Sequence, residues 1–486
     1  MLVTLAVVPL SSVFGKDNST VGIKVNTIRT YMNFSKAIDP AQIITMADLE
    51  LSVALASPLV TFDKERQITS ALANKWQNIN KNKIKFTLRP NLKWSDGSPI
   101  SALHFKEALD RAKKDHASDL RALFDSVASI DVDGNDSLVF TTVEEVSKSG
   151  ILLKLTEPMY GLVFINNGKL DLSKSAGSFV VDNHDDHHIL LSANKNWYEY
   201  SDQMPSKVEI RRIPKDIDVI TNFKKDEWSN LISGTSLMKA VVKDAMTANG
   251  FTTWQRSLDK VFSLYPSKKF LDQGGANFLK ELSLKINKSN LLDNFTGYAL
   301  ADQFFPRGYE LWSAEPPIIK LQENFSHNRT IRIVIPDNQY AIAFKGNLEK
   351  TLALLTKTKI DCKLFPINEL NNQLKSGDYD LLAGGVAVAD PNFEGAMSFF
   401  IERDPPFIPS GPAPNDFSQQ MKLTRSLATS KERASSMRKI IIRAQEAGYV
   451  LPLFHFSSLA IAKPGIDLSE VPNSDETVLF SKVRIR

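Results

Sequence analysis

Hydrophobic and polar residues alternate in several short stretches of the chain, and this period of two predicts β-strands. In KIKFTL, residues 83–88, three apolar side chains alternate with polar ones. Asp96-Gly97 follows as a turn pair, because glycine accepts positive φ and aspartate bonds to nearby backbone. Apolar residues then recur with helical spacing over 105–112, after Ser101, a residue type that caps helices. The pattern predicts a strand, a tight turn and a capped helix.

A second set of patterns lies between residues 331 and 389. The runs IRIVIP, IDCKLF and YDLLAGGVAVA have the character of strands, and two amphipathic helical stretches separate them. This alternation predicts a β-α-β-α-β wound sheet with right-handed crossovers. In such open sheets the ligand lies beyond the carboxyl ends of the strands, which points to Gly384 through Asp390, with Ala387, Val388 and Asp390 as the candidate ligand-binding residues. The alternative is that the small residues only lead the strand into a turn.

Length and composition narrow the class of protein. A chain of 486 residues is too long for one core, since single cores stop growing near about 250 to 300 residues, so two lobes or more are expected. The net charge of +4 is spread along the chain without a basic run, which does not favour nucleic acid as a partner. Cys362 is the only cysteine, which excludes an intrachain disulfide and a Cys-x-x-Cys redox pair.

The first fifteen residues, MLVTLAVVPLSSVFG, are apolar and uncharged. They resemble the hydrophobic region of a secretory signal, so we expect export and a signal peptide over residues 1–15. A buried first strand is the alternative. No later run approaches the ~18 apolar residues that a membrane span needs. Because Cys362 lies far from the N-terminus, no lipid-anchor cysteine is expected.

The segment DNHDDHH, residues 182–188, holds three of the seven histidines. Zinc or nickel binds such side chains, but the flanks GSFVV and HILLSA are strand-like and predict the solvated tip of a hairpin. Sequence motifs of metalloproteases, P-loop enzymes and Gly-x-Ser-x-Gly hydrolases are absent, and Ser95 has no base in its motif. We therefore predict a protein that is not an enzyme and carries no metal or cofactor.

Residues 71–112, with Leu-Ala-x-x-Trp, Phe-x-Leu-Arg and Trp-Ser-Asp-Gly-x-Pro in that order, resemble the extracellular solute-binding proteins of family 5, the oligopeptide and dipeptide type. Further similar segments are AIDPAQIIT at 37–45, NKNWYE at 194–199, GDYDLLAGG at 377–385 and LPLFHF at 451–456. The resemblance implies an α/β fold of the two-lobed periplasmic-binding-protein type, in its large class with three subdomains and a hinged interlobe cleft.

The same resemblance implies domain boundaries. Residues 16–257 and 450–486 form a discontinuous first lobe, with an inserted subdomain near 50–180, and residues 258–449 form the second lobe. The chain leaves the first lobe near DKVFSLYP, residues 259–266, and returns through the last strand, so that two crossing strands make a hinge.

Ligand-binding residues carry over from the family only where its segments match. Ile44 and Thr45 correspond to a wall of the first lobe, Ser233 and Thr235 to a loop that closes over the ligand, and Phe456 to an aromatic residue facing the cleft. Ordinary packing is the alternative for each of them.

One departure from the family concerns the ligand. Peptide-binding members have Gly-Trp after the Gly-x-Tyr-Asp strand, and then an aspartate that pairs with the peptide's α-amino group. Here Val386 follows Gly385, and Ala389 occupies the aspartate position. Asp390 either replaces that aspartate or is only the structural Asp of Asp-Pro. A buried ammonium group without a counter-ion is costly, so this loop bears on the ligand class.

The resemblance implies the substrate-binding component of an ABC importer. Such a protein is a periplasmic monomer that captures a short peptide or a similar solute by hinge closure and delivers it to an inner-membrane permease. A sensor or partner-binding protein on the same lobes is the alternative. A hydrolase is less favoured, because no nucleophile and base can be named.

Overall fold

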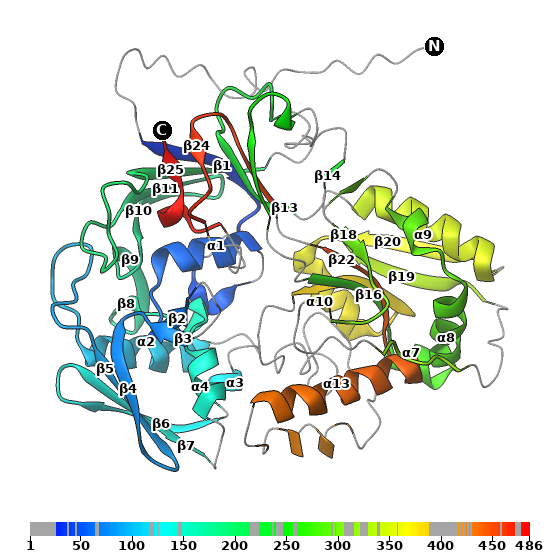
Figure 1. Ribbon diagram of the computed structural model, residues 1–486, viewed down its shortest axis with the longest axis horizontal. Helices are drawn as coiled ribbons and strands as arrows, with labels where there is room; N and C mark the ends of the chain where they lie inside the picture. The colour runs from blue at the N-terminus through cyan, green and yellow to red at the C-terminus, as the bar shows by residue number, and fades with distance from the viewer. Residues whose placement is uncertain are drawn as a thin grey trace.

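The computed structural model places two lobes side by side, each with its own sheets and cores (Figure 1). The residues that it describes are 26–35, 38–43, 46–63, 68–115, 121–124, 126–143, 148–213, 223–235, 238–239, 246–255, 260–292, 295–296, 298–305, 315–320, 329–337, 341–356, 358–387, 417, 419–420, 423–424, 427, 430–456, 459–471 and 478–486. The predicted signal segment, residues 1–15, lies outside this part of the chain. No helix within it is long and apolar enough to cross a membrane.

A four-stranded sheet forms the centre of the first lobe, in the order β1-β12-β11-β10. β1 runs parallel to β12, and the other pairs are antiparallel. A three-stranded sheet, β13-β23-β15, lies beside it. Alternate residues of the larger sheet enter one core with helix α1 and the C-terminal segment. The bounds are β1 (Thr27–Met32), α1 (Met46–Leu55), β10 (Phe179–His184), β11 (His188–Ala193), β12 (Lys207–Arg212), β13 (Leu231–Thr235), β15 (Thr252–Gln255), β23 (Leu459–Ala462), β24 (Ile466–Asp467), η6 (Phe480–Lys482) and β25 (Arg484–Ile485).

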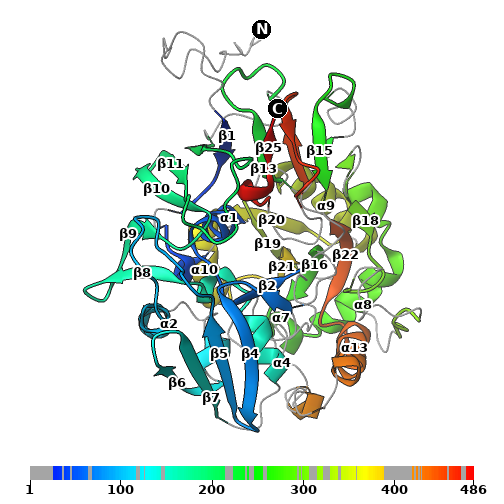
Figure 2. The same cartoon turned by 60° about the vertical axis from the view of Figure 1, so that its left-hand side comes forward.

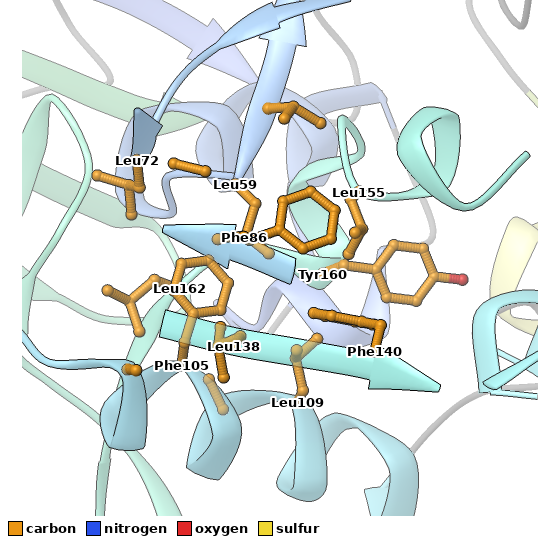
Figure 3. Close-up of a cluster of buried hydrophobic side chains, with 14 of the residues drawn as sticks. Leu59, Leu72, Phe86, Phe105, Leu109, Leu138, Phe140, Leu155, Tyr160 and Leu162 are labelled. Carbon is orange, nitrogen blue, oxygen red and sulfur yellow. The ribbon is translucent and has the colours of Figure 1, made fainter. Parts of the chain in front are cut away.

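A separate core between residues 41 and 176 corresponds to the predicted inserted subdomain. Phe86 and Phe140 of neighbouring strands meet edge to face, 5.2 Å apart, and Phe105 and Leu109 of α2 pack onto the same sheet (Figure 3). Each such fully buried side chain contributes about 1.5 to 3 kcal/mol. The elements are η2 (Pro40–Gln42), β2 (Val60–Phe62), β3 (Ile68–Ser70), β4 (Ala73–Asn80), β5 (Lys83–Leu88), α2 (Ala102–Asp115), α3 (Arg121–Phe124), β6 (Val127–Asp133), β7 (Ser137–Thr142), α4 (Lys148–Lys154), η4 (Pro158–Tyr160), β8 (Val163–Asn166) and β9 (Lys169–Ser175).

The Trp-Ser-Asp-Gly stretch is a structural turn, as the sequence predicts. Gly97 has φ of 86°, a left-handed conformation that glycine adopts without strain. The Asp96 carboxylate binds Lys174 of β9 at 2.7 Å and accepts a hydrogen bond from the amide of Ser98 at 2.9 Å. These contacts, that of Lys174 first, hold the pKa of Asp96 well below its usual range. The turn therefore attaches the β8–β9 hairpin to the subdomain.

The second lobe is built on a six-stranded sheet in the order β18-β22-β16-β21-β19-β20. β19 lies parallel to both β20 and β21, which confirms the predicted wound sheet. β16 runs antiparallel to β21 and β22, so the complete sheet is mixed. Helices α8 and α9 cover one face, and α10 and α13 cover the other. The bounds are β16 (Lys260–Pro266), α7 (Lys268–Asp272), α8 (Gly275–Lys285), η5 (Lys288–Leu291), β18 (Tyr298–Leu300), β19 (Ile331–Pro336), α9 (Ala341–Thr356), β20 (Ile360–Phe365), α10 (Ile367–Ser376), β21 (Leu381–Ala387), α13 (Ser430–Ala447) and β22 (Leu451–Phe456), with the short pair β14 (Met238–Lys239) and β17 (Phe295–Thr296).

The second lobe extends further along the chain than the boundary predicted at residue 450. β22 is hydrogen-bonded between β16 and β18, so residues 451–456 belong to the six-stranded sheet and the return to the first lobe comes after them. The outgoing crossing lies between β15 and β16, at residues 256–259, and the return crossing at residues 457–458. Both crossings fall outside the residues whose structure is described.

Candidate ligand-binding site

The end of the six-stranded sheet that is joined to the first lobe carries the predicted ligand wall. Lys260, the first residue of β16, pairs with Ala387 on one side and with Phe456 on the other. β21 and β22 therefore both end there, at the carboxyl edge of the parallel strands, where ligands bind in open sheets. The structure describes the main chain of Ala387 but not its side chain, and Val388 and Asp390 lie outside its description.

Phe456 is half-buried at this edge and belongs to an aromatic cluster. Its ring centroid lies 6.1 Å from that of Phe454 and 6.5 Å from that of Phe262, and the latter two rings stack at 5.0 Å. A Cβ atom added to Gly385 would come within 3.1 Å of the Phe456 ring, whereas at Gly384 the nearest atom would be 3.6 Å away. The missing side chain at Gly385 thus makes room for Phe456 rather than for a ligand.

The first-lobe wall predicted at Ile44 and Thr45 lies outside the described residues, but its two flanks are well defined. On one side, Asp39 accepts a hydrogen bond from the amide of Ala41 at 2.9 Å and opens η2. Both oxygens of Asp39 also bind Arg111 of α2, and the two side chains are only 7% and 10% exposed. On the other side, α1 begins at Met46. The ion pair between Asp39 and Arg111 thus attaches η2, the segment before the predicted wall, to α2 of the inserted subdomain.

Ser233 contacts a buried carboxyl group that the sequence analysis did not identify. Its hydroxyl lies 3.0 Å from Oε2 of Glu50 on α1, and Glu50 is 2% exposed. Burial raises the pKa of Glu50 to about 8, although the hydrogen bond from Ser233 opposes the rise. Glu50 is therefore mostly protonated and neutral at pH 7. Thr235, two residues on, pairs its main chain with Leu459 of β23, and its side chain is not described.

His455, next to Phe456, points to the opposite face of the sheet. Its Nε2 lies 3.0 Å from the carbonyl oxygen of Gln303 and 3.3 Å from that of Phe304, and both oxygens accept. Burial lowers the pKa of His455 to about 4, against the effect of these two hydrogen bonds. The imidazole is neutral at pH 7 and joins β22 to the loop after β18.

Local patterns gave little sign of Glu50, Phe262 or His455. Glu50 lies between two leucines of α1, two residues after Asp48, and this position gives no sign that its side chain is buried. Phe262 and Phe454 are separated by nearly two hundred residues, and only the pairing of β16 with β22 brings them together. Long-range strand pairing thus builds the aromatic part of the site.

The histidine-rich segment forms a hairpin tip, as predicted. β10 and β11 pair on either side of it, and Asp185 accepts hydrogen bonds from the amides of His187 at 2.7 Å and His188 at 2.8 Å. Throughout the described part of the chain, no group of three His, Cys, Asp or Glu side chains could hold a metal ion. The hydroxyl of Ser95 is 3.1 Å from the amide of Ser175 and acts as a structural contact.

Comparison with known proteins extends over nearly the whole chain. A binding protein of Haemophilus influenzae is 21% identical over 489 residues, covering 92% of this chain and 86% of its own. The structure of the Escherichia coli murein tripeptide binding protein MppA matches with a TM-score of 0.78 at 12% identity, covering 94% and 98% of the two chains. Haemophilus influenzae OppA in complex with RPPGFSPFR matches with a TM-score of 0.77 at 15% identity, covering 95% and 99%.

Structures with this fold have been solved with ligands that range from a peptide to a nickel–histidine complex and agropinic acid. The fold is thus the mixed α/β architecture of the OppA and MppA class of periplasmic binding proteins, over the full length. Residues 67–361 match the model of the bacterial extracellular solute-binding proteins, family 5. This match takes in more than half of the chain, which therefore belongs to that family of non-enzymatic solute-binding proteins.

Proposed function

We propose that the protein captures a short peptide or a similar small solute between its two lobes and delivers it to the permease of an ABC importer in the inner membrane. The observation that supports this most directly is the position of Phe456 and the end of β21, at the edge where both connections to the first lobe begin. A solute held there contacts both lobes only when they close. It would therefore shift the population toward the closed form, which the permease binds.

The similar proteins support a peptide as the solute. One of them is a murein tripeptide binding protein, and another was solved with the nonapeptide RPPGFSPFR. A peptide would lie extended and bond to main-chain groups, with its side chains in wet pockets, which gives broad specificity. Ile44, Thr45, Ser233 and Thr235 would bind from the first lobe. Ala387, Val388, Asp390 and Phe456 would bind from the second.

The cellular setting belongs to the same proposal. Residues 1–15 would direct the chain to the periplasm of a Gram-negative cell and be removed, and the mature protein would work there as a monomer. Mass spectrometry of the mature N-terminus after expression of the full chain would locate the cleavage. A protein that keeps Met1 and stays in the cytoplasm would contradict this part of the proposal.

Native mass spectrometry of the protein purified without denaturation tests the capture of peptides, because closed receptors of this kind retain their ligand. We expect a series of peptide masses that is released on unfolding. X-ray scattering should then show a smaller radius of gyration for the loaded protein than for the same protein after unfolding and refolding. A metal chelate or a sugar in place of peptides, or scattering that does not change, would refute the proposal.

A further inference from the structure

Glu50 has the most unusual environment of the carboxyl groups that the structure describes in the first lobe. It lies in the middle of α1, 2% exposed, and Ser233 holds one of its two oxygens at 3.0 Å. The other oxygen, Oε1, is buried and has no hydrogen-bond partner among the described residues. A buried polar atom left in this way costs about 1 to 3 kcal/mol, so this oxygen calls for an explanation.

The strand that holds Ser233 is irregular at that residue. β13 pairs with β23 at Ile232 and again at Thr235, and the register shifts between these two positions. Such bulges leave residues outside the ladder and turn their side chains, and they are common beside binding sites. β23 is also the strand by which the chain re-enters the first lobe, and α1 and β13 lie on the side of this lobe nearest the second (Figures 1 and 2). Glu50 therefore contacts the irregular part of β13, on the side of the first lobe nearest the second.

No charged neighbour accounts for the carboxyl group. Burial and the Ser233 hydroxyl alone set its pKa. Three carboxylates of α1 and the elements packed against it have other contacts: Asp48 accepts a hydrogen bond from the amide of Ser35, Asp39 binds Arg111, and Asp182 binds Ser192. Two further titratable groups there, Glu157 and His184, do not contribute to the pKa of Glu50. The counter-charge for an ionised Glu50 is thus absent from the described part of the protein.

We propose that Glu50 is the counter-ion for a cationic group of the bound solute, and that the solute is therefore one with an ammonium group, such as a peptide with a free amino terminus. The inference rests on the proposed capture of a peptide-like solute and adds the class of group that the site selects. Glu50 would thus take the role of the aspartate that peptide-binding members carry at the position of Ala389.

The chemistry favours a cation over a neutral donor. A pKa of about 8 means that the neutral acid is preferred only about tenfold at pH 7. A hydrogen bond between an ammonium group and a carboxylate is worth about 10- to 150-fold, which is enough to ionise the acid when the solute binds. For a neutral donor, the side-chain amide of an asparagine or glutamine would serve equally well, and the ability of Glu50 to take on charge would not be needed. Binding should therefore release the proton of Glu50.

Glu50→Gln is the decisive variant, since the amide has the shape of the neutral acid and keeps the contact with Ser233. Glu281→Gln, a change at another buried glutamate that is paired with Lys285 in the second lobe, is the matched control. The probes are a randomised tripeptide library with free amino termini and the same library N-acetylated. Binding of each library is measured by equilibrium dialysis against protein that has first been unfolded and refolded to release bound solute. Thermal unfolding at pH 6.5 checks that all three proteins fold.

The expected result is that wild type and Glu281→Gln prefer the free library about 2- to 15-fold at pH 7, which is the gain of 10- to 150-fold less the cost of ionising the acid, and that Glu50→Gln loses this preference. Affinity of the wild type for free peptides should rise about two- to sixfold from pH 6 to pH 7, with about half to one proton released per peptide in calorimetry at pH 7, and both effects should be absent in Glu50→Gln. Equal binding of both libraries, or a Glu50→Gln protein that keeps the preference, overturns the role of Glu50 but leaves peptide capture intact. If neither library binds the wild type, peptide capture and this inference both fail.

Discussion

Replacement of Glu50 by glutamine should change how the stability of the first lobe depends on pH in the ligand-free protein. The unfolded chain loses the Glu50 proton above pH 4.5, whereas the folded chain keeps it until about pH 8. The folded state therefore binds more protons between these values, and stability falls as pH rises through this window. At about 1.4 kcal/mol for each pKa unit, the rise from 4.5 to about 8 corresponds to about 4 to 5 kcal/mol, of which most is lost between pH 5 and pH 8.

Urea unfolding of wild type and Glu50→Gln at pH 5 and pH 8 measures this effect. Fluorescence reports chiefly on the first lobe, because five of the six tryptophans lie there: Trp76, Trp94, Trp197, Trp228 and Trp254. Wild type should lose about 3 to 4 kcal/mol more than the variant between the two pH values, since only wild type ionises a buried acid. Glu281→Gln should behave like wild type. An equal loss in wild type and Glu50→Gln would show that Glu50 is ionised in the folded protein, and would remove the basis for its role as a counter-ion.

Three further changes test other contacts of the site. Arg111→Met leaves Asp39 buried without its cation and should lower the free energy of unfolding by about 3 to 5 kcal/mol in urea, whereas an exposed ion pair would give less than about 1. Gly385→Leu should displace the ring of Phe456 and cost about 1 to 3 kcal/mol by thermal unfolding, and a matched change at the preceding glycine should cost less. His455→Gln should lose about 3 kcal/mol less stability than wild type between pH 6.5 and pH 4. Burial lowers the pKa of this histidine to about 4, so the folded wild-type protein resists protonation in this range. Parallel curves of stability against pH for the two proteins would contradict this.

Elements that depend on local periodicity were predictable from the sequence. The strand, turn and helix around Asp96-Gly97 follow from residues close together in the chain, and so does the parallel unit β19, β20 and β21. What local pattern could not show is how these units join. The sequence predicts β16 and β22 as isolated apolar strands, and only the antiparallel pairing of β16 with β21 and with β22 makes one sheet. The lobe boundary predicted at residue 450 lies before β22 for this reason. β22 follows the last helix and leads back to the first lobe, so it was assigned to the first lobe.

The site shows the same division. Phe456 was chosen as a site residue from its segment alone, and its packing on Gly385 depends on β21 and β22 lying on either side of β16. Arg111 and Asp39 are far apart in sequence, and neither type of residue signals burial by itself. Glu50 was missed because two carboxylates in α1, Asp48 and Glu50, form no motif, and the burial of Glu50 is a property of the assembled lobe.

Glu50 and His455 differ in how easily each can respond to a charged solute. At pH 7, protonation of His455 opposes a pKa of about 4 and is disfavoured about a thousandfold, while ionisation of Glu50 opposes a pKa of about 8 and is disfavoured only about tenfold. Of these two groups, the one that can change its charge on binding gains a negative charge. His455 also keeps its Nε2 on the carbonyl oxygens of Gln303 and Phe304, which ties it to the fold rather than to a solute. Of the two groups, Glu50 alone therefore supports the proposed cationic solute.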